Sequence, residues 1–439
     1  MLVSSIGANS QVPVFKEPQP ARLFVMPNYT PQVVTPGYRP SVGPTFFNPS
    51  VPSSQDQVRM ADQDIANWQQ QKAMEQQALN ETNREFSGQV SYKFPSRLNN
   101  RGADFYKTAF DTLTNMLNGS KILSYKRAVF ASEWAFYEGT LPYREFNEAI
   151  KYSASLIKAK MKQDKLPSSN LAKNWAIFEF FSDTVKIKSL GPEKKSVTHY
   201  PLRYDFEDFY GEKDWTKGMV SKLLSYQTGQ CHSMPLLYLI LAEELGSTAY
   251  LANAPEHTYI KIPLPNGTFQ NIELTNGHLT NDAYVLSSGY IKAEAIASKI
   301  YMKPLTKKQV IAQCLLDLAK GYRNKYGHDE FYLNMVQTAL IHQPNNVTGL
   351  YMVVSYHYWL LRFVLDQDPL ILKKPKEQHP EVWQLVDKIT FYNNKLISLG
   401  YEEMPKDAYA DWLKSIEKEK ERSKKMGMAI QESLWQKKN

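Results

Sequence analysis

Three residues in the middle of the chain have the side chains that a thiol-based catalytic site would use. Cys231 supplies a nucleophilic sulfur, His257 an imidazole base and Glu273 a carboxylate. A histidine beside a cysteine takes the thiol proton, and a third polar group holds the imidazole in position. The combination predicts attack of a thiolate on a carbonyl carbon, with the imidazole returning the proton to the leaving group.

The residues that follow Cys231 predict a helix that begins close to the cysteine. Apolar side chains recur through residues 236–245, and Gly246 provides a helix end. Pro235 is tolerated in a first helical turn, because its missing N–H would have no partner there. Cys231 is therefore expected at the helix N-terminus, or within one residue of it, where the helix dipole favours a thiolate.

Three strands are predicted after this helix, at residues 249–253, 258–264 and 268–274. His257 stands immediately before the second strand. The tripeptide Pro-Asn-Gly at 265–267 suits a three-residue hairpin turn whose glycine adopts the left-handed conformation. The segment is therefore expected to form a small antiparallel sheet beside the helix.

The register of this hairpin decides which residue orients His257. A three-residue turn pairs Leu264 with Thr268 and places Glu273 on the same face of the sheet, diagonally opposite the histidine. A two-residue turn would instead place Asn276 opposite His257. Glu273 is the preferred third residue, and Asn276 is the alternative.

This arrangement resembles the transglutaminase-like superfamily, whose papain-like core is shared with cysteine proteases. The resemblance rests on Gly229-Gln230-Cys231 at a helix start, His257 opening a strand and a carboxylate near the end of the next strand. It covers residues 215–300 well and is most similar to bacterial members with tetratricopeptide repeats after the core. The resemblance implies Cys231 as nucleophile, His257 as general base and acid, and Glu273 as orienting group.

Two features depart from the family pattern. Thr258 follows the histidine, and its strand lacks the tryptophan usual in the animal enzymes. Glu273 stands where aspartate is commoner, so a longer side chain has to be accommodated.

The oxyanion of a thiol acyl transfer needs hydrogen-bond donors near the sulfur. The backbone N–H of Cys231 is a natural donor. The side chains of Gln227, Gln230 and Trp215 are candidates for a second one.

A metal site and a disulfide framework are not predicted. Cys231 and Cys314 are the two cysteines of the chain, and Cys314 lies in an apolar helical run that predicts a core position. A metal site built from Cys231, His232, His257 and His278 is disfavoured, because adjacent residues at a helix start point apart. The chemistry proposed for the cysteine needs no cofactor.

The composition is that of a globular protein, with 439 residues, 43% hydrophobic and 22% charged. The net charge of +8 is spread along the chain without an arginine-rich stripe among aromatics, so no nucleic-acid partner is expected. Since the chain has no run of about 18 apolar residues, no transmembrane segment is expected.

The first ten residues are open to two interpretations. MLVSSIGANS is short and apolar and ends in the small-x-small pattern Ala8-Asn9-Ser10, which signal peptidase accepts, but it lacks a basic start. A signal-peptide remnant at residues 1–10 would place the protein in the periplasm or outside the cell. A disordered tail would be compatible with the cytoplasm.

Composition and periodicity divide the chain into four regions. Residues 1–58 form a Pro-rich segment predicted to be disordered, 59–200 a helical region, 201–303 the transglutaminase-like core, and 304–439 a helical, tetratricopeptide-like region. Helices are expected near residues 102–118, 121–138, 143–162, 171–183, 306–323, 329–342, 346–366, 379–399 and 406–435.

The expected fold class is α+β, with a helix packed on an antiparallel sheet between helical regions. The leading function is Cys-His-Glu-dependent acyl transfer or hydrolysis of an amide or peptide, with a protein or peptide as substrate. The alternative is an inactive transglutaminase-like scaffold that binds a peptide or protein partner, and a weaker one is a structural protein of the bacterial envelope. No oligomeric state is predicted.

Overall fold

The computed structural model describes most of the chain between residues 92 and 414. The described residues are 92–190, 195–208, 211, 213–286, 290–405, 407–408, 410–412 and 414. The predicted segment 1–58, the signal-peptide-like residues 1–10 and most of the predicted helix 406–435 lie outside them. The described residues from Lys93 onward belong to one compact unit.

Four helices precede the core and agree with the four that the sequence predicts there. They are α2 (Ala103–Leu117), α3 (Tyr125–Phe136), α4 (Tyr143–Gln163) and α5 (Asn170–Ser182). Two of them start at serine caps: the Ser124 hydroxyl accepts the N–H of Arg127, and the Ser169 hydroxyl accepts that of Ala172. Such caps satisfy N–H groups that have no partner within a helix.

Two short strand pairs, which the sequence did not predict, lie between these helices and the core. They are β2 (Val185–Leu190) with β3 (Lys195–His199), antiparallel, and β4 (Arg203–Tyr204) with β5 (Thr228–Gly229), parallel. A 3-10 helix, η1 (Trp215–Gly218), and α6 (Val220–Tyr226) come between β4 and β5. The β4–β5 pair anchors the segment leading to Cys231, since the Gly229 carbonyl accepts the Asp205 N–H at 2.9 Å.

The core consists of one helix and a four-stranded antiparallel sheet. The helix is α7 (Ser233–Leu245), and the strands, in sheet order, are β6 (Tyr250–Ala254), β7 (His257–Pro263), β8 (Phe269–Glu273) and β9 (His278–Thr280). Every residue of α7 except Glu243 and Glu244 is buried, as expected for a helix that is covered on all sides. The helix ends at Gly246, which is left-handed with φ of 62°.

The β7–β8 hairpin has the predicted three-residue turn. Gly267 is left-handed with φ of 80°, and the Leu264 N–H donates to the Thr268 carbonyl at 2.8 Å. The same register continues along both strands. It brings Glu273 to the face of the sheet that His257 occupies, diagonally opposite it, as the sequence predicted.

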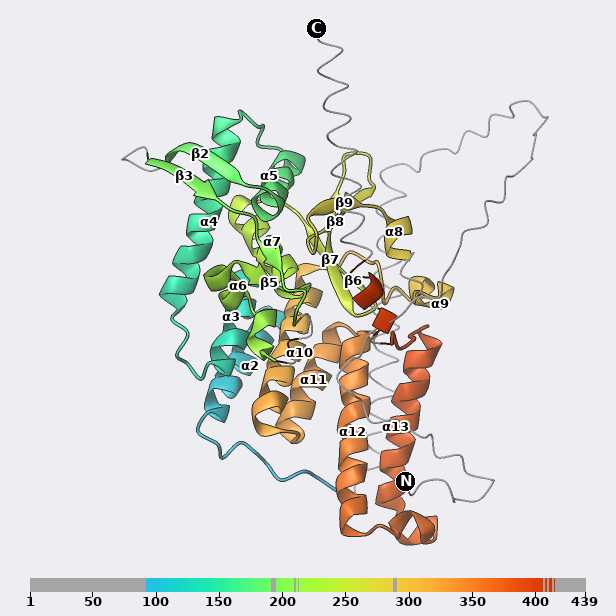
Figure 1. Ribbon diagram of the computed structural model, residues 1–439. Coiled ribbons are helices and arrows are strands. Elements are labelled where there is room, and N and C mark those ends of the chain that lie inside the picture. Colours follow the sequence, from blue (N-terminus) through green and yellow to red (C-terminus); the bar gives the residue numbers. More distant parts are fainter. Residues whose placement is uncertain are drawn as a thin grey trace, which may run out of the picture. The chain divides into compact units, whose positions relative to one another are not determined.

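The C-terminal region is helical and reaches back to the N-terminal helices. Its elements are α8 (Asp282–Leu286), α9 (Ala293–Ala297), α10 (Lys307–Tyr326), α11 (Glu330–His342), α12 (Val347–Gln367), η2 (Ile371–Lys373), η3 (Lys376–Gln378) and α13 (Pro380–Ser398). The four long helices confirm the predicted ones, and α12 and α13 run side by side (Figure 1). Because α10 packs against α2 and α3, residues far apart in sequence meet beside the start of α7.

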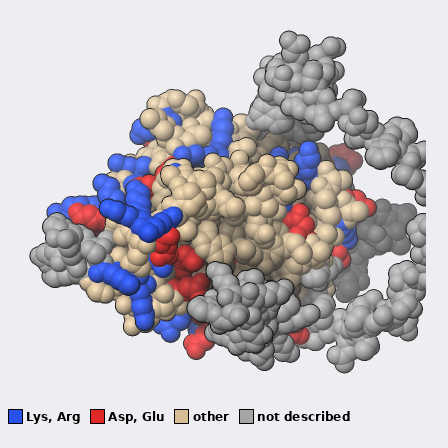
Figure 2. All heavy atoms as spheres, turned by 90° about the horizontal axis from the view of Figure 1, so that it is seen from above, with Lys and Arg blue, Asp and Glu red and all other residues tan. Residues whose placement is uncertain are grey.

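The fold is thus a mixture of helices and antiparallel sheet, which confirms the α+β class. Among the described residues, no helix is both long and apolar enough to span a membrane. On the face drawn in Figure 2, basic and acidic side chains lie next to one another among uncharged ones.

Candidate active site

Cys231 lies immediately before the first turn of α7. His232 is the residue that caps the helix, and Ser233 is the first helical residue. The thiol is partly exposed, and its Sγ is 4.0 Å from the backbone carbonyl oxygen of Glu256. A glycine is needed two residues earlier, because a Cβ at Gly229 would lie 2.7 Å from the Ser233 hydroxyl. The Ser233 hydroxyl also accepts the backbone N–H of Gln230 at 3.0 Å, and this hydrogen bond tightens the turn that presents the thiol.

His257 and Glu273 form a buried pair behind the thiol. The imidazole Nε2 is 2.8 Å from a carboxylate oxygen of Glu273, and the two side chains are 2% and 5% exposed. The other carboxylate oxygen accepts the backbone N–H of Thr275 at 3.0 Å. Glu273 is therefore held from two sides, which fixes the plane of the imidazole.

Electrostatics favours the protonated imidazole. Burial alone would lower the pKa of His257, but the Glu273 carboxylate and a hydrogen bond with the Cys231 side chain outweigh it and raise the pKa to about 10. Burial would raise the pKa of Glu273, but the neighbouring imidazole and the Thr275 N–H lower it below its ordinary value. The pair is therefore an imidazolium and a carboxylate at neutral pH.

The hydrogen bonds also define the roles of the two ring nitrogens. Nε2 faces a carboxylate, so it is the donor to Glu273. That leaves Nδ1 as the nitrogen for the Cys231 side chain, with which the imidazole also shares a hydrogen bond. Cys231, His257 and Glu273, which the sequence singled out, thus lie in a continuous chain of hydrogen bonds.

Thr258 connects the strand of the histidine to the residue of the thiol. Its hydroxyl donates a hydrogen bond to the backbone carbonyl of Cys231. The residue on the other side of the histidine, Glu256, is left-handed with φ of 51°. The carbonyl oxygen of Glu256 lies 4.0 Å from the sulfur of Cys231. The cysteine segment is therefore contacted by the residues on both sides of His257. Thr258, which the sequence marked only as a departure from the family pattern, has a positioning contact in the site.

Replacing Thr258 is expected to loosen the alignment of thiol and imidazole. Thr258→Val keeps the shape of the side chain but removes the donor, and we expect a loss of roughly 1 kcal/mol in the free energy of unfolding. Alkylation of Cys231 by iodoacetamide should also slow, because the thiol is no longer held beside the imidazole. Thr258→Ser retains the hydroxyl and should behave like the parent. If Cys231 is alkylated at the same rate in Thr258→Val and Thr258→Ser, the Thr258 hydroxyl has no positioning role.

Trp412 covers the histidine and was not identified from the sequence. Its ring lies edge-on to the imidazole of His257, with 4.7 Å between ring centroids and 75° between planes, and it is buried. It also lies near the ring of Tyr284, at 6.4 Å. The Trp412 ring thus contributes to the burial of the imidazole that pairs with Glu273. The strand of the histidine lacks a tryptophan, and here one comes from a distant segment instead.

The other predicted site residues are placed as follows. Asn276 is buried, and its side-chain oxygen is hydrogen-bonded to Nδ1 of His278, while Glu273 takes Nε2 of the His257 imidazole. Gln230 is buried near the thiol and donates from its side-chain amide to the Asp208 carbonyl. Gln227 is the exposed, left-handed end of α6.

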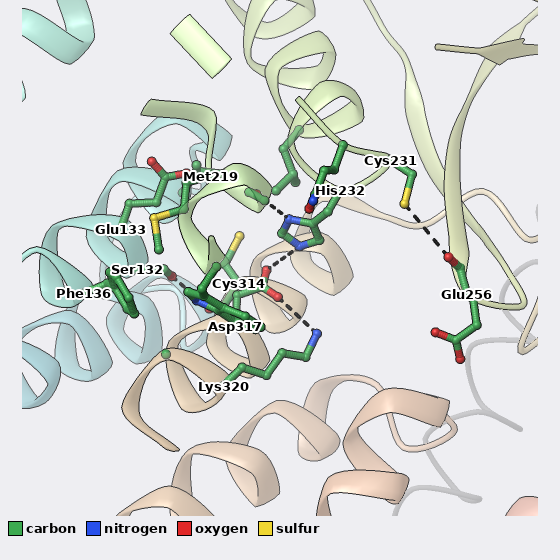
Figure 3. A pocket seen from close by; sticks show the side chains of 16 residues that line it. Ser132, Glu133, Phe136, Met219, Cys231, His232, Glu256, Cys314, Asp317 and Lys320 are labelled. Atoms are coloured by element: carbon green, nitrogen blue, oxygen red, sulfur yellow. Dashed lines mark hydrogen bonds and ion pairs between the residues drawn. The ribbon is translucent and has the colours of Figure 1, made fainter. Parts of the chain in front are cut away.

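A cavity of about 270 Å³ opens beside the thiol. Figure 3 shows Cys231 and Glu256 on one side of it and Ser132, Glu133 and Phe136 on the other. Most of its other lining residues come from η1, from the start of α7 and the residues before it, and from α10. The full set is Val129, Ser132, Glu133, Phe136, Trp215, Gly218, Met219, Gln230, Cys231, His232, Leu236, Glu256, Cys314, Asp317, Lys320 and Gly321. Of the side chains considered for the oxyanion, Trp215 and Gln230 therefore line the cavity.

The residues considered for a metal are engaged elsewhere. His232 is bonded to Gly218 and Asp317, and His278 to Asn276. Among the described residues, no group of three or more histidine, cysteine or acidic side chains is placed to hold a metal ion. Cys314 is 2% exposed, and burial raises the pKa of its thiol, as expected for a core cysteine.

The geometry can support thiol chemistry: a partly exposed sulfur, an imidazolium at its side, a buried carboxylate behind the imidazole and a cavity in front. Comparison of the chain with protein-family models, curated proteins and solved structures gave no match.

Proposed function

We propose that the protein transfers acyl groups from amides or peptides through Cys231, in a core of the transglutaminase-like, papain-like type. The observation that carries the proposal is the chain Cys231–His257–Glu273, in which a buried carboxylate holds an imidazolium beside a partly exposed thiol. The order of elements supports the family resemblance: a cysteine before a buried helix, a histidine at the first position of β7 and a carboxylate at the last position of β8.

The proposed reaction has two steps. The Cys231 thiolate attacks the carbonyl carbon of the substrate, a carbon–sulfur bond forms, and the carbon–nitrogen bond breaks. His257 gives its proton to the departing amine, so the thiol proton ends on the leaving group. Water or a second amine then attacks the carbonyl carbon of the thioester and loses a proton to the imidazole. The carbon–sulfur bond breaks, which releases the acyl product and restores the Cys231 thiolate beside the protonated His257. The choice between hydrolysis and transfer depends on which acceptor reaches the acyl-enzyme.

The negative charge on the carbonyl oxygen needs donors during both steps. The Cys231 backbone N–H is one candidate. Gln230 is the second, because its side chain lines the cavity and is fixed by the Asp208 carbonyl, which occupies one of its two amide N–H groups.

An activated ester tests the proposal without knowledge of the natural substrate. We expect p-nitrophenyl acetate to release a stoichiometric burst of nitrophenolate and to leave one acetyl group on Cys231, detected by intact mass and peptide mapping. Cys231→Ser should lose the burst, whereas Cys314→Ser should keep it. If a folded parent protein shows no acetylation at Cys231, the catalytic proposal fails and the inactive scaffold is the better interpretation.

A further inference from the structure

Several charged side chains line the cavity beside Cys231, and only some of them have their charge balanced by neighbouring groups of the protein. Glu133 is one of them, and both of its carboxylate oxygens accept backbone N–H groups at the start of α6, from Val220 at 2.6 Å and Ser221 at 2.9 Å. Burial raises the pKa of Glu133, and the hydrogen bonds from Ser221 and Val220 offset part of that rise. Glu133 is therefore satisfied within the protein and offers no free charge to a ligand.

His232 is a cation that is already paired. Its Nδ1 lies 3.1 Å from the Gly218 carbonyl oxygen and its Nε2 lies 3.0 Å from Asp317. Both partners only accept hydrogen bonds, so both ring nitrogens must donate, and a ring that donates twice is protonated. Desolvation opposes the charge, but Asp317 and the Gly218 carbonyl outweigh it and raise the pKa of His232. Asp317 is thereby committed to the imidazolium.

Lys320 is the cation left over. Its Nζ is 3.5 Å from the second oxygen of Asp317, a long contact to a carboxylate that already serves His232. The side chains of His232, Asp317 and Lys320 together thus carry one net positive charge. Among the described residues, Lys320 makes no second ion pair. Its ammonium group keeps donors for a ligand within the cavity.

The ammonium group of Lys320 and the thiol of Cys231 share one cavity, because both residues line it. Figure 3 shows the Lys320 side chain reaching past Asp317 toward the part of the cavity where Cys231 and Glu256 lie, and the positive charge of Lys320 acts on Glu256. Among the described residues these two side chains form no ion pair within 4.0 Å, and both line the cavity in which a ligand would lie. The carboxylate of Glu256 points away from the thiol in this view.

From this arrangement we infer that Lys320 binds a carboxylate of the substrate, so that the preferred substrates carry a negative charge close to the reacting carbonyl. The inference rests on the proposed function, since it assigns a substrate class to the same site. Asp317 and His232 act as positioning residues, because they hold Lys320 at the cavity without neutralising it. Glu256 sets the opposite boundary by repelling an anion that is bound on the wrong side.

Two alkylating reagents of nearly equal size test the inference. Iodoacetate carries a carboxylate next to the reacting carbon, and iodoacetamide carries a neutral amide at the same place. The measured quantity is the ratio of the two alkylation rates at Cys231, followed by mass spectrometry at neutral pH and low salt and divided by the same ratio for free cysteine. A cation that attracts the carboxylate raises this normalised ratio above one.

Four variants separate the sources of the effect. Lys320→Gln should lower the normalised ratio by roughly fivefold, and Lys320→Arg should preserve it. Lys308→Gln removes a positive charge from the exposed side of the same helix and should change little. Glu256→Gln removes the opposing charge and should raise the ratio. Added salt should reduce the ratio of the parent, because it screens the attraction.

The outcomes distinguish this inference from the proposed function. If Cys231 reacts rapidly with iodoacetamide, but its normalised ratio is one and is unchanged in Lys320→Gln, the carboxylate preference is overturned while the catalytic thiol stands. If Cys231 reacts with neither reagent in the folded chain, the proposed function itself is overturned. A ratio that falls equally in Lys308→Gln would show only a general effect of net charge, and would also overturn the inference.

Discussion

Iodoacetamide is expected to alkylate Cys231 at pH 6 on the order of a hundred times faster in the parent protein than in the variant His257→Gln. An ordinary thiol with a pKa of about 8.5 is roughly 0.3% ionised at pH 6 and therefore reacts slowly. In the parent, the pKa of His257 is raised to about 10, so the imidazole stays protonated and stabilises a thiolate beside it. The rate should remain nearly constant from neutral to mildly acidic pH, whereas the variant should lose rate about tenfold per pH unit.

Glutamine is chosen for this variant because its amide can still donate to Glu273. The buried carboxylate keeps a partner, and a slow reaction is then not explained by unfolding. Circular dichroism and the unfolding midpoint serve as the check on folding. Cys314 provides an internal control: it is buried and should react only when the protein is denatured. A parent rate that follows an ordinary thiol titration, equal to that of the variant, would contradict the ion pair.

The part of the site that the sequence predicts depends on local rules. Cys231 and the helix after it follow from an apolar run that ends at Gly246, and the contact of His257 with Glu273 follows from the hairpin register. That register is set by one tripeptide whose Gly267 adopts the left-handed conformation, so a choice between two turn lengths decided between Glu273 and Asn276. Over so short a distance along the chain, strand geometry leaves few alternatives.

The remaining parts depend on contacts between distant segments. Trp412 reaches the imidazole of His257 from a segment more than a hundred residues away, and Lys320 enters the cavity because α10 packs against α2 and α3. Neither position has a signal in the sequence, since a tryptophan or a lysine on a helix is ordinary. The β4–β5 pair was missed for a simpler reason: strands of two residues are too short to show an alternation. The β2–β3 pair was missed although Val185 and Ile187 alternate with lysines in β2.

Replacement of Glu273 is expected to have the largest effect on stability. Glu273→Ala removes one member of a buried ion pair and leaves the imidazole of His257 without its acceptor, for which we expect a loss of about 3–5 kcal/mol in the free energy of unfolding. Glu273→Gln has nearly the same shape and retains an acceptor oxygen, so it should lose less. Both variants should lose the fast alkylation of Cys231 at pH 6, because no carboxylate remains to keep the imidazole protonated.

The pH dependence of this loss follows from the pKa values. The pKa of His257 rises from an ordinary value near 6.5 to about 10, so its contribution is complete below about pH 6.5 and is lost as the pH rises toward 10. The pKa of Glu273 is lowered in the folded state, so its contribution is present above its ordinary value near 4.3 and is lost as the pH falls below it. The difference in stability between parent and Glu273→Gln should therefore be greatest between about pH 4.5 and 6.5.

Chemical unfolding of the parent and both variants at pH 5.5, 7.5 and 9.5 measures this difference directly. We expect it to shrink steadily over the three values, because the unfolded chain releases the proton of the histidine at a lower pH than the folded chain does. A difference that is constant over this range would mean that the imidazole is neutral in the folded protein. In that case the carboxylate would only accept a hydrogen bond from a neutral ring, and the ion-pair form of the thiol site would have to be abandoned even if Cys231 remained reactive.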